Sequence, residues 1–297
     1  MIQTLINIAT LGSVYLLFAL GMALVWGTIG ILNFAHGATF MFSAFCAHLV
    51  VAQVPLGLPA VVAIAVLVGA VMAVLTQFFA FAPIMARAKD HRSAEMRILI
   101  AGIGVAAIPL AIAQRQTRSF PFGFQGTTYQ DTVFTLGGLA RVTSTDLIVL
   151  VSALVLGIAV TLWLHRSRQG LALRAIGADA ETASLMGAHR TGLAMTTMAV
   201  AGGMAGLAGA LLTFRLQAIA PESGDALLIK AFAIIVLGGL GSMLGAVVGS
   251  YILAAAETLI LFYNLGSWVD AVSFGLIFCF LLFRPQGLFG RAEVRRT

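Results

Sequence analysis

The feature that most constrains this chain is a series of apolar runs, each long enough to cross a lipid bilayer as a helix. A crossing needs about 20 apolar residues, and roughly eight such segments lie between Met1 and Phe283. Backbone N–H and C=O groups cannot stay unpaired in lipid, so only helix bundles and closed barrels span it. The runs are continuous rather than alternating. We therefore expect an all-α polytopic membrane protein with about eight membrane-embedded helices, including broken or re-entrant segments.

The composition excludes an ordinary soluble domain. Hydrophobic residues make up 60% of the chain and charged residues 9%, whereas soluble domains carry about 25% charged residues. No internal repeat and no low-complexity linker is visible, so we interpret residues 1–297 as one domain. Neither Lys nor Arg precedes Arg87, so the first run is expected to be a retained membrane segment and not a secretory signal. The net charge of +6 comes from clustered basic residues, which indicates topology rather than a nucleic-acid partner.

The sequence contains no motif for chemistry. It has no G-x-x-x-x-G-K-[ST] loop and only two lysines, Lys89 and Lys230, so it cannot hold ATP phosphates in a Walker loop. It also has no H-E-x-x-H, no metal-binding Cys/His spacing and no G-x-S-x-G. Cys46 and Cys279 lie in apolar runs, where small packed residues are the expected role. We predict no catalytic residue, no metal site and no cofactor bound by this chain.

Basic residues predict the topology. The loop Arg87–Arg97 and the segment that begins at His165 are rich in them, so the positive-inside rule assigns both to the cytoplasm. The long polar stretch Gln114–Thr145 then lies outside. The same count of crossings predicts that Arg215–Lys230 is also external.

Two apolar segments are interrupted by glycine. In GTIGILNFAHG, Gly27–Gly37, the residues Asn33, His36 and Gly37 stand in an otherwise apolar context, which predicts a broken or kinked helix. One interpretation is that the polar pair caps the break and bonds to freed carbonyls. The other is that these residues line a translocation path, because intramembrane polar groups often mark pathways. The residues alone leave both open.

The second interruption is LGGLGSMLGAVVG within Ala231–Asn264. As one helix this stretch is about 50 Å long, too long for one crossing and short for two. A single crossing here would also place the basic tail RAEVRR outside. A re-entrant hairpin that turns near Gly238, Gly239 and Gly241 places the tail inside, so we predict a cytoplasmic C-terminus.

Two further features concern packing. Gly202, Gly206 and Ala210 are four residues apart and share one helical face, which predicts a seam where two helices approach closely. Glu257 is the one acid deep within a run, and we expect a structural carboxylate satisfied by a partner.

A polar, helix-prone segment at about residues 166–190 separates two long apolar runs. Apolar residues recur in it at helical spacing and predict one apolar face beside Arg174, Asp179 and Glu181; they are Leu173, Ile176, Ala180, Ala183 and Met186 or Gly187. Such a face buries in lipid headgroups or in a groove of a partner. A solvated connector is the alternative.

Within this segment Glu181, Ala183 and Gly187 stand in the order E-x-A-x-x-x-G, which resembles the E-A-A-x-x-x-G coupling loop of ATP-binding-cassette (ABC) importers, with Thr182 in place of the second Ala. Four stretches, in order and spacing, resemble the permeases of branched-chain amino acid importers, in the subfamily of the first of their two permease subunits. They are ILNFAHG, LRAIGADAETASLMGAHR, KAFAIIVLGGLGSMLGAVVGSYILAAAETL and LLFRPQGLFGR.

This resemblance implies a single transmembrane permease domain in the bacterial inner membrane, surrounded by lipid. It implies four partners: a second homologous permease, two ATP-binding subunits that use ATP and Mg²⁺, and a periplasmic substrate-binding protein. The residues expected to couple to the ATP-binding subunits are Arg174, Asp179, Glu181, Ala183 and Gly187.

The implied substrates are leucine, isoleucine and valine. Importers of urea and short-chain amides share this permease type, and Leu216–Leu228 departs from the family pattern, so the substrate stays open. A stand-alone secondary carrier or channel is the alternative from another class. It would need intramembrane charge pairs or an ion site, and the runs hold almost none. A membrane scaffold would leave the broken helices unexplained.

Overall fold

The computed structural model describes residues 1–88, 91–136, 140–284 and 287–290. Its helices are α1 (Ile2–Ile29), α2 (Ala35–Val51), α3 (Leu58–Thr76), α4 (Ala82–Arg87), α5 (His91–Thr117), α6 (Ser144–Arg166), α7 (Arg168–Ala178), α8 (Ala180–Leu185), α9 (Arg190–Leu216), α10 (Ser223–Gly238), α11 (Met243–Phe262) and α12 (Val269–Phe283). A π-helical turn (Gln77–Phe81) joins α3 to α4, and a 3₁₀ turn (Gly266–Trp268) precedes α12. The strands are β1 (Val133–Leu136) and β2 (Ala140–Thr143).

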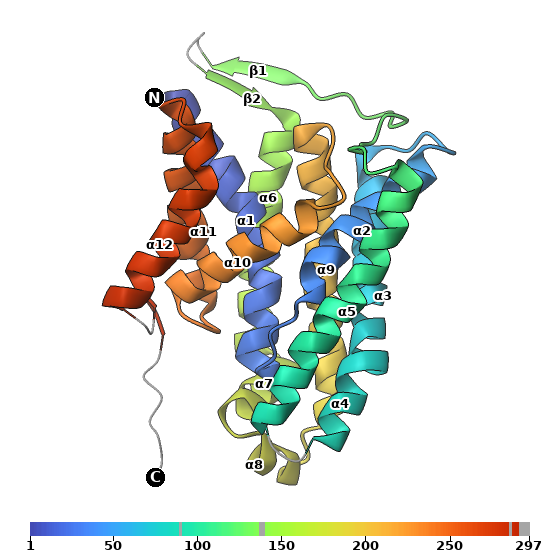
Figure 1. Cartoon of the computed structure of the whole chain (residues 1–297), viewed down its shortest axis with the longest axis vertical. Coiled ribbons are helices and arrows are strands. Elements are labelled where there is room, and N and C mark those ends of the chain that lie inside the picture. The colour runs from blue at the N-terminus through green and yellow to red at the C-terminus, as the bar shows by residue number, and fades with distance from the viewer. Residues whose placement is uncertain (89–90, 137–139, 285–286, 291–297) are drawn as a thin grey trace.

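Hydropathy and length identify the crossings. Within the described residues, 6 helical segments are long and apolar enough to span a bilayer: Ile2–Ile29, Leu58–Arg87, Ser93–Thr117, Ser144–Arg166, Arg190–Leu216 and Met243–Phe262. The shorter helices α2, α10 and α12 pack among them (Figure 1). The predicted class, an all-α polytopic membrane protein, is confirmed.

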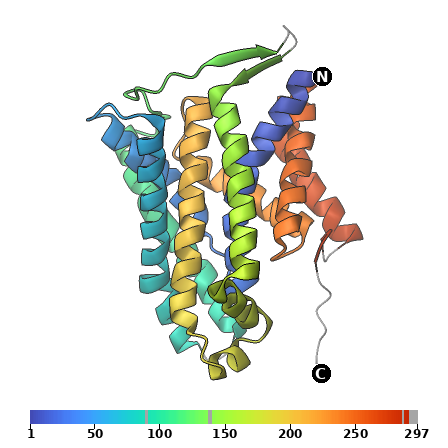
Figure 2. The same cartoon turned by 180° about the vertical axis from the view of Figure 1, so that it is seen from behind.

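The centre of the bundle is formed by α1 and α9. In each of these two helices, 83% of an 18-residue apolar stretch is buried, against 22% of the corresponding stretches in α5 and α6. A helix that is apolar on all sides is stable when other helices surround it, and α9 lies between α3 and α6 in the rear view (Figure 2). Exposed apolar side chains on the outer helices form the surface available to lipid; they include Leu67, Val71, Ile100, Ile103, Val151 and Leu154.

The contact between α3 and α9 depends on small residues. A Cβ atom at Gly206 would overlap the carbonyl oxygen of Ala65, and one at Gly202 would overlap that of Gly69. Ala210, the third residue of the predicted seam, is fully buried one turn further along α9. The seam residues on α9 therefore allow its backbone to touch that of α3.

Both predicted interruptions are present. α1 ends at Ile29, and α2 begins at Ala35 after an unwound segment. α10 ends at Gly238, and the chain turns through Gly239 and Gly241, with φ of 101° and 77°, before α11 begins at Met243. Positive φ is readily tolerated only by glycine, so these two residues permit the reversal. α11 then returns toward the end of the bundle that carries the strands (Figure 1).

One predicted boundary is wrong. The second interrupted apolar segment is predicted to begin at Ala231, but α10 already begins at Ser223, after α9 has continued to Leu216. That Arg215–Lys230 lies outside stays a prediction. Ser223–Lys230 is therefore the first half of α10. A helix can carry Lys230 into apolar surroundings because Glu257 of α11 lies 2.9 Å from its ammonium group.

The polar stretch Gln114–Thr145 contains an unpredicted antiparallel hairpin, in which β1 pairs with β2 from Val133↔Thr143 to Leu136↔Ala140. A reciprocal capping box between Thr143 and Asp146 starts α6. Burial raises the pKa of Asp131, but hydrogen bonds from the Ser144 hydroxyl and the Thr145 amide outweigh it and hold that pKa below its usual value.

The seam yields a stability prediction. Gly206→Leu should force α9 away from α3, at a cost of about 1–3 kcal/mol or more, because the new side chain meets backbone that cannot rotate aside. The measurement is the yield of monodisperse protein in detergent and its Tm. Gly104→Leu on α5 is the control, since a Cβ there meets nothing within 4 Å. Equal yield and Tm for both variants would contradict the packing assignment.

Candidate coupling segment and translocation path

Residues 166–190 form α7 and α8 at the end of the bundle opposite the strands (Figure 1). The prediction of one apolar face along a single helix is wrong, because the helix is interrupted at Asp179, which has φ −156° and ψ 104°. The Asp179 carboxylate accepts from the Thr182 amide at 3.1 Å and from the Thr182 hydroxyl at 2.6 Å. Aspartate favours such caps over helix interiors, so it starts α8 instead of continuing α7.

The interruption divides the segment into an anchored part and a projecting part. Leu173 and Ala183 are buried, and the Arg174 guanidinium donates to the His165 carbonyl at 3.4 Å, so these residues hold the segment to the bundle. Leu185 and Met186 are 84% and 85% exposed. Gly187 follows with φ 90° and open space beside it. Glu181 belongs to α8, but its side chain lies outside the described part of the structure.

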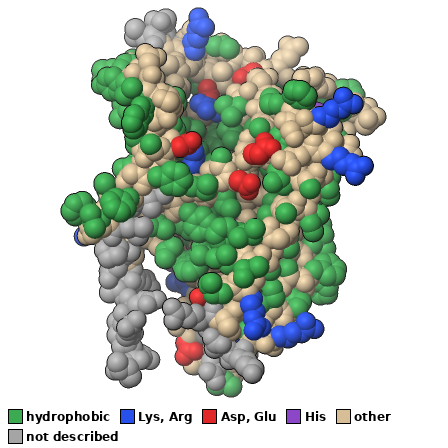
Figure 3. Space-filling model, in the orientation of Figure 1, with side chains coloured by type: hydrophobic (Ala, Val, Ile, Leu, Met, Phe, Trp, Pro, Cys, Tyr) green, Lys and Arg blue, Asp and Glu red, His purple; other side chains and the backbone are tan. Residues whose placement is uncertain are grey.

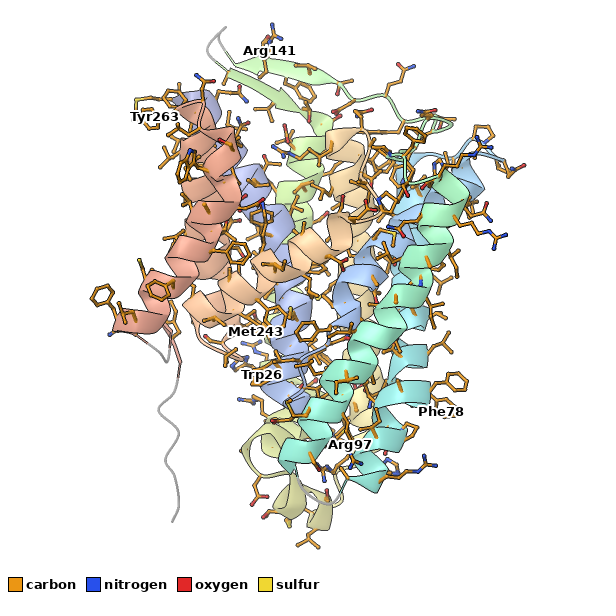
Figure 4. All side chains as sticks on the ribbon, in the orientation of Figure 1. Trp26, Phe78, Arg97, Arg141, Met243 and Tyr263 are labelled. Atoms are coloured by element: carbon orange, nitrogen blue, oxygen red, sulfur yellow. The ribbon has the colours of Figure 1, made fainter. Side chains whose placement is uncertain are left out.

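A row of three glycines joins this segment to the bundle. A Cβ at Gly177 of α7 would lie 2.8 Å from the carbonyl oxygen of Gly27, near the end of α1. A Cβ at Gly27 would in turn lie 2.9 Å from the carbonyl oxygen of Gly241 in the hairpin turn. A Cβ at Gly241 would also lie 3.6 Å from the ring of Trp26, the side chain next to Gly27 on α1, which Figure 4 labels. The backbone of α7 therefore contacts that of α1, and the backbone of α1 contacts that of the hairpin turn. No sequence motif identified Gly177, and only this contact distinguishes it.

The first break is held by its polar side chains. Asn33 Oδ1 accepts from the Ala35 amide at 3.0 Å, and His36 Nε2 donates to the Phe18 carbonyl of α1 at 3.2 Å. Both side chains are buried, and no partner for His36 Nδ1 occurs among the described residues. The two residues thus hold the unwound segment against α1, and a role in a translocation path stays a prediction.

The first break also supports the hairpin. A Cβ at Gly37 would collide with the backbone of Gly224 in α10, and the rings of Phe34 and Phe232 lie 5.0 Å apart. The first break and the start of α2 are therefore packed against the α10 arm of the hairpin.

The hairpin is closed on both sides. Within it, Gly238 packs directly against Gly245 of α11. The Leu288 and Phe289 amides donate to the Leu237 and Gly238 carbonyls, each at 2.9 Å. These bonds satisfy carbonyls that the end of α10 would leave free. Gly239 lies against Phe289 and its neighbour, so the tail segment fixes the turn.

The hairpin carries a buried ion pair that sequence reasoning missed. Glu257 of α11 is 2% exposed and accepts from three groups: the Lys230 ammonium at 2.9 Å, the Tyr15 hydroxyl at 2.5 Å and the Ser273 hydroxyl at 2.7 Å. The expectation that Glu257 is satisfied by a partner is confirmed. The expectation that the membrane runs hold almost no charge pair is wrong. The available signal was a lone lysine within the apolar sequence LLIKAFAII.

Charged side chains gather on the same face, in the half nearer the strands (Figure 3). Arg215 of α9 pairs with Asp146 of α6 at 3.1 Å, while Asp225 of α10 and Asp270 of α12 are exposed. Within the described ranges no cluster of three His, Cys, Asp or Glu side chains could hold a metal ion.

Comparisons with known proteins place this geometry in context. The family described as "Branched-chain amino acid transport system / permease component" matches residues 4–281. The high-affinity branched-chain amino acid transport system permease protein BraD of Pseudomonas aeruginosa is 32% identical over 100% of this chain and 98% of its own length. The corresponding LivH protein of Escherichia coli is 31% identical, with 100% and 97% covered. No solved structure matches.

A second kind of permease is also similar. The LivM permease protein of the same transport system in Salmonella typhimurium is 25% identical over 95% of this chain and 69% of its own length. The chain is therefore similar to both LivH and LivM, two permease proteins named for high-affinity branched-chain amino acid transport systems.

The Asp179 cap yields a local prediction. Asp179→Ala should loosen α8, because losing an N-cap costs about 0.5–2 kcal/mol and a helix this short has little other support. Hydrogen exchange at residues 180–187 should become faster, while exchange in α9 stays unchanged. Asp179→Asn is the matched control, since its side-chain oxygen can still accept from Thr182. Unchanged exchange in the Ala variant would show that the cap does not hold the segment.

Proposed function

The chain belongs to the family of branched-chain amino acid transport system permeases, and from this premise we propose that it is one membrane subunit of an ATP-driven importer of leucine, isoleucine and valine. The observation that carries the proposal is full-length similarity to relatives that are themselves named as permeases of such systems. The substrates are taken from those names, and urea and short-chain amides are the alternatives that the experiment below separates.

The proposed partners follow from the same systems. A second, homologous permease would pair with this chain, as the similarity to LivM suggests. Two ATP-binding subunits would bind ATP and Mg²⁺, since this sequence lacks a Walker loop. A periplasmic substrate-binding protein would deliver the amino acid. This chain itself would perform no chemical step.

The proposed orientation puts α7 and α8 in the cytoplasm of a bacterium and the strands in the periplasm. Basic residues are more numerous at the α7–α8 end, where Arg97 lies, than at the end where Arg141 lies (Figure 4). The C-terminus is proposed to be cytoplasmic because its tail is basic; residues 291–297 lie outside the described part of the chain.

The face shown in Figure 3 is the proposed contact with the second permease. Charged side chains are costly against lipid, yet several gather on this face (Figure 3). Asp225 of α10 and Asp270 of α12 are exposed acids on helices of the bundle. A protein partner or a water-filled path accommodates them. The translocation path would then run between the two permeases, beside the hairpin formed by α10 and α11.

Coupling would begin at the tip of α8. Leu185 and Met186 present apolar surface that a groove in an ATP-binding subunit could bury. A displacement of α7 would act through Gly177 on Gly27, and through Gly27 on the hairpin turn at Gly241. The hairpin would thereby respond to nucleotide binding in the partner.

Uptake into proteoliposomes tests the function. The chain, purified with its natural partners, should import leucine, isoleucine and valine only with the binding protein outside and ATP inside. Urea and acetamide should not be imported. Import of urea would contradict the proposed branched-chain amino acid substrates. Leucine uptake driven by an ion gradient without ATP would instead favour a stand-alone secondary carrier.

The docking of α8 can be tested separately. Met186→Asp should reduce co-purification of the ATP-binding subunits about tenfold or more, because a charge would be buried in an apolar groove. Phe134→Asp on β1 is the control, since Phe134 is also exposed but lies at the opposite end. Normal co-purification of the Met186 variant would leave the segment as a solvated connector.

A further inference from the structure

Four embedded helices each contribute one polar side chain to a single cluster. These are Tyr15 of α1, Lys230 of α10, Glu257 of α11 and Ser273 of α12. A charge in the membrane interior is expensive, so each charged residue requires its partner. Packing of apolar helices does not require the pair at all, because apolar residues of similar volume often stabilise a bundle as well or better.

The two charged residues are held differently. Both oxygens of the Glu257 carboxylate are engaged: Oε1 accepts from Ser273, and Oε2 accepts from Tyr15 and Lys230. The carboxylate is therefore fixed by three helices. The Lys230 ammonium has three N–H groups and donates to two partners, Tyr15 at 3.0 Å and Glu257 at 2.9 Å. Its third N–H has no partner among the residues that the structure describes.

Lys230 is also the accessible member. Its side chain is 19% exposed, against 3% for that of Glu257. A lysine has a flexible four-carbon stem and rotatable donors, so it can swing away from the carboxylate while keeping its charge in a polar contact. The cluster thus consists of a fixed anionic half and a movable cationic half, in a hairpin beside the proposed path.

We propose that Lys230 and Glu257 form a transient binding site for the charged backbone of an α-amino acid in transit. The substrate carboxylate would accept from Lys230, and the substrate ammonium would replace the lysine as the donor to Glu257. One ion pair is exchanged for two, and no net charge is added to the membrane interior. The site would accept free α-amino acids, which carry both charges, and reject urea and amides.

This inference rests on the proposed function and names the residues that would recognise its substrate class. The competing interpretation is a structural latch, in which the pair only joins α10 to α11. The two differ when both charges are removed. A latch can be replaced by neutral groups of similar size, whereas a zwitterion site cannot, because the substrate charges would then be buried without partners.

The decisive variant is Lys230→Met with Glu257→Gln in the complete transporter in proteoliposomes. We expect normal assembly and ATP hydrolysis stimulated by the loaded binding protein, but leucine uptake at least about tenfold below wild type. The control removes a neutral polar contact of the same hairpin, as Ser13→Ala with Tyr251→Phe, which breaks the 3.0 Å hydrogen bond between α1 and α11. It should keep leucine uptake.

Wild-type leucine uptake by the double variant would overturn the site while leaving the proposed function intact. Absence of leucine uptake by the wild-type complex would instead refute the proposed function.

A second measurement avoids any folding defect. Labelled leucine should bind the wild-type complex without the binding protein, and unlabelled leucine should compete. Leucinamide lacks the carboxylate and 4-methylpentanoate lacks the ammonium, so each leaves one buried charge unpaired and should compete at least about tenfold more weakly. Equal competition by either analogue, or no leucine binding, would overturn the site.

Discussion

The structure depends on the requirement that every backbone polar group within a membrane be paired. This chain interrupts its helices twice inside the bundle, and hydrogen bonds outside the helical pattern pair backbone groups at each interruption. The Asn33 side chain accepts from the Ala35 amide at the first break, and the Leu288 and Phe289 amides donate to the last carbonyls of α10 at the second. Irregular backbone can therefore lie in the interior with these polar groups paired.

The lipid environment also makes the ion pair between Lys230 and Glu257 important to the hairpin. Lys230 and Glu257 lie on the two arms of the α10–α11 hairpin, so a relative movement of the arms would lengthen their ion pair unless the flexible lysine side chain followed the carboxylate. The ion pair therefore favours the arrangement of the two arms that the structure shows. Membership of a permease family assigns the transport role, and the proposed translocation path runs beside this hairpin.

Much of this fold could be predicted because a bilayer imposes length and polarity directly on the sequence. The runs, the break near Asn33 and the hairpin turn near Gly239 all followed from hydropathy, glycine and loop charge. The start of α10 did not, because the cost of Lys230 depends on a carboxylate 27 residues away, which local hydropathy cannot register. The interruption at Asp179 was missed for a different reason, since apolar spacing continues across a residue whose cap divides the helix.

The contact from Gly177 through Gly27 to Gly241 has a mechanical consequence. Side chains absorb small displacements by changing rotamer, whereas touching backbones have no such slack. If α7 is displaced, as proposed above, the contact leaves little room for the shift to be absorbed between these backbones. The three glycines have no side chain that could be enlarged in small steps, since even the methyl group of alanine would push the backbones apart. Substitutions that adjust the proposed coupling without disrupting this contact would therefore have to lie at its two ends, on the surface of α7 and α8 or in the α10–α11 hairpin.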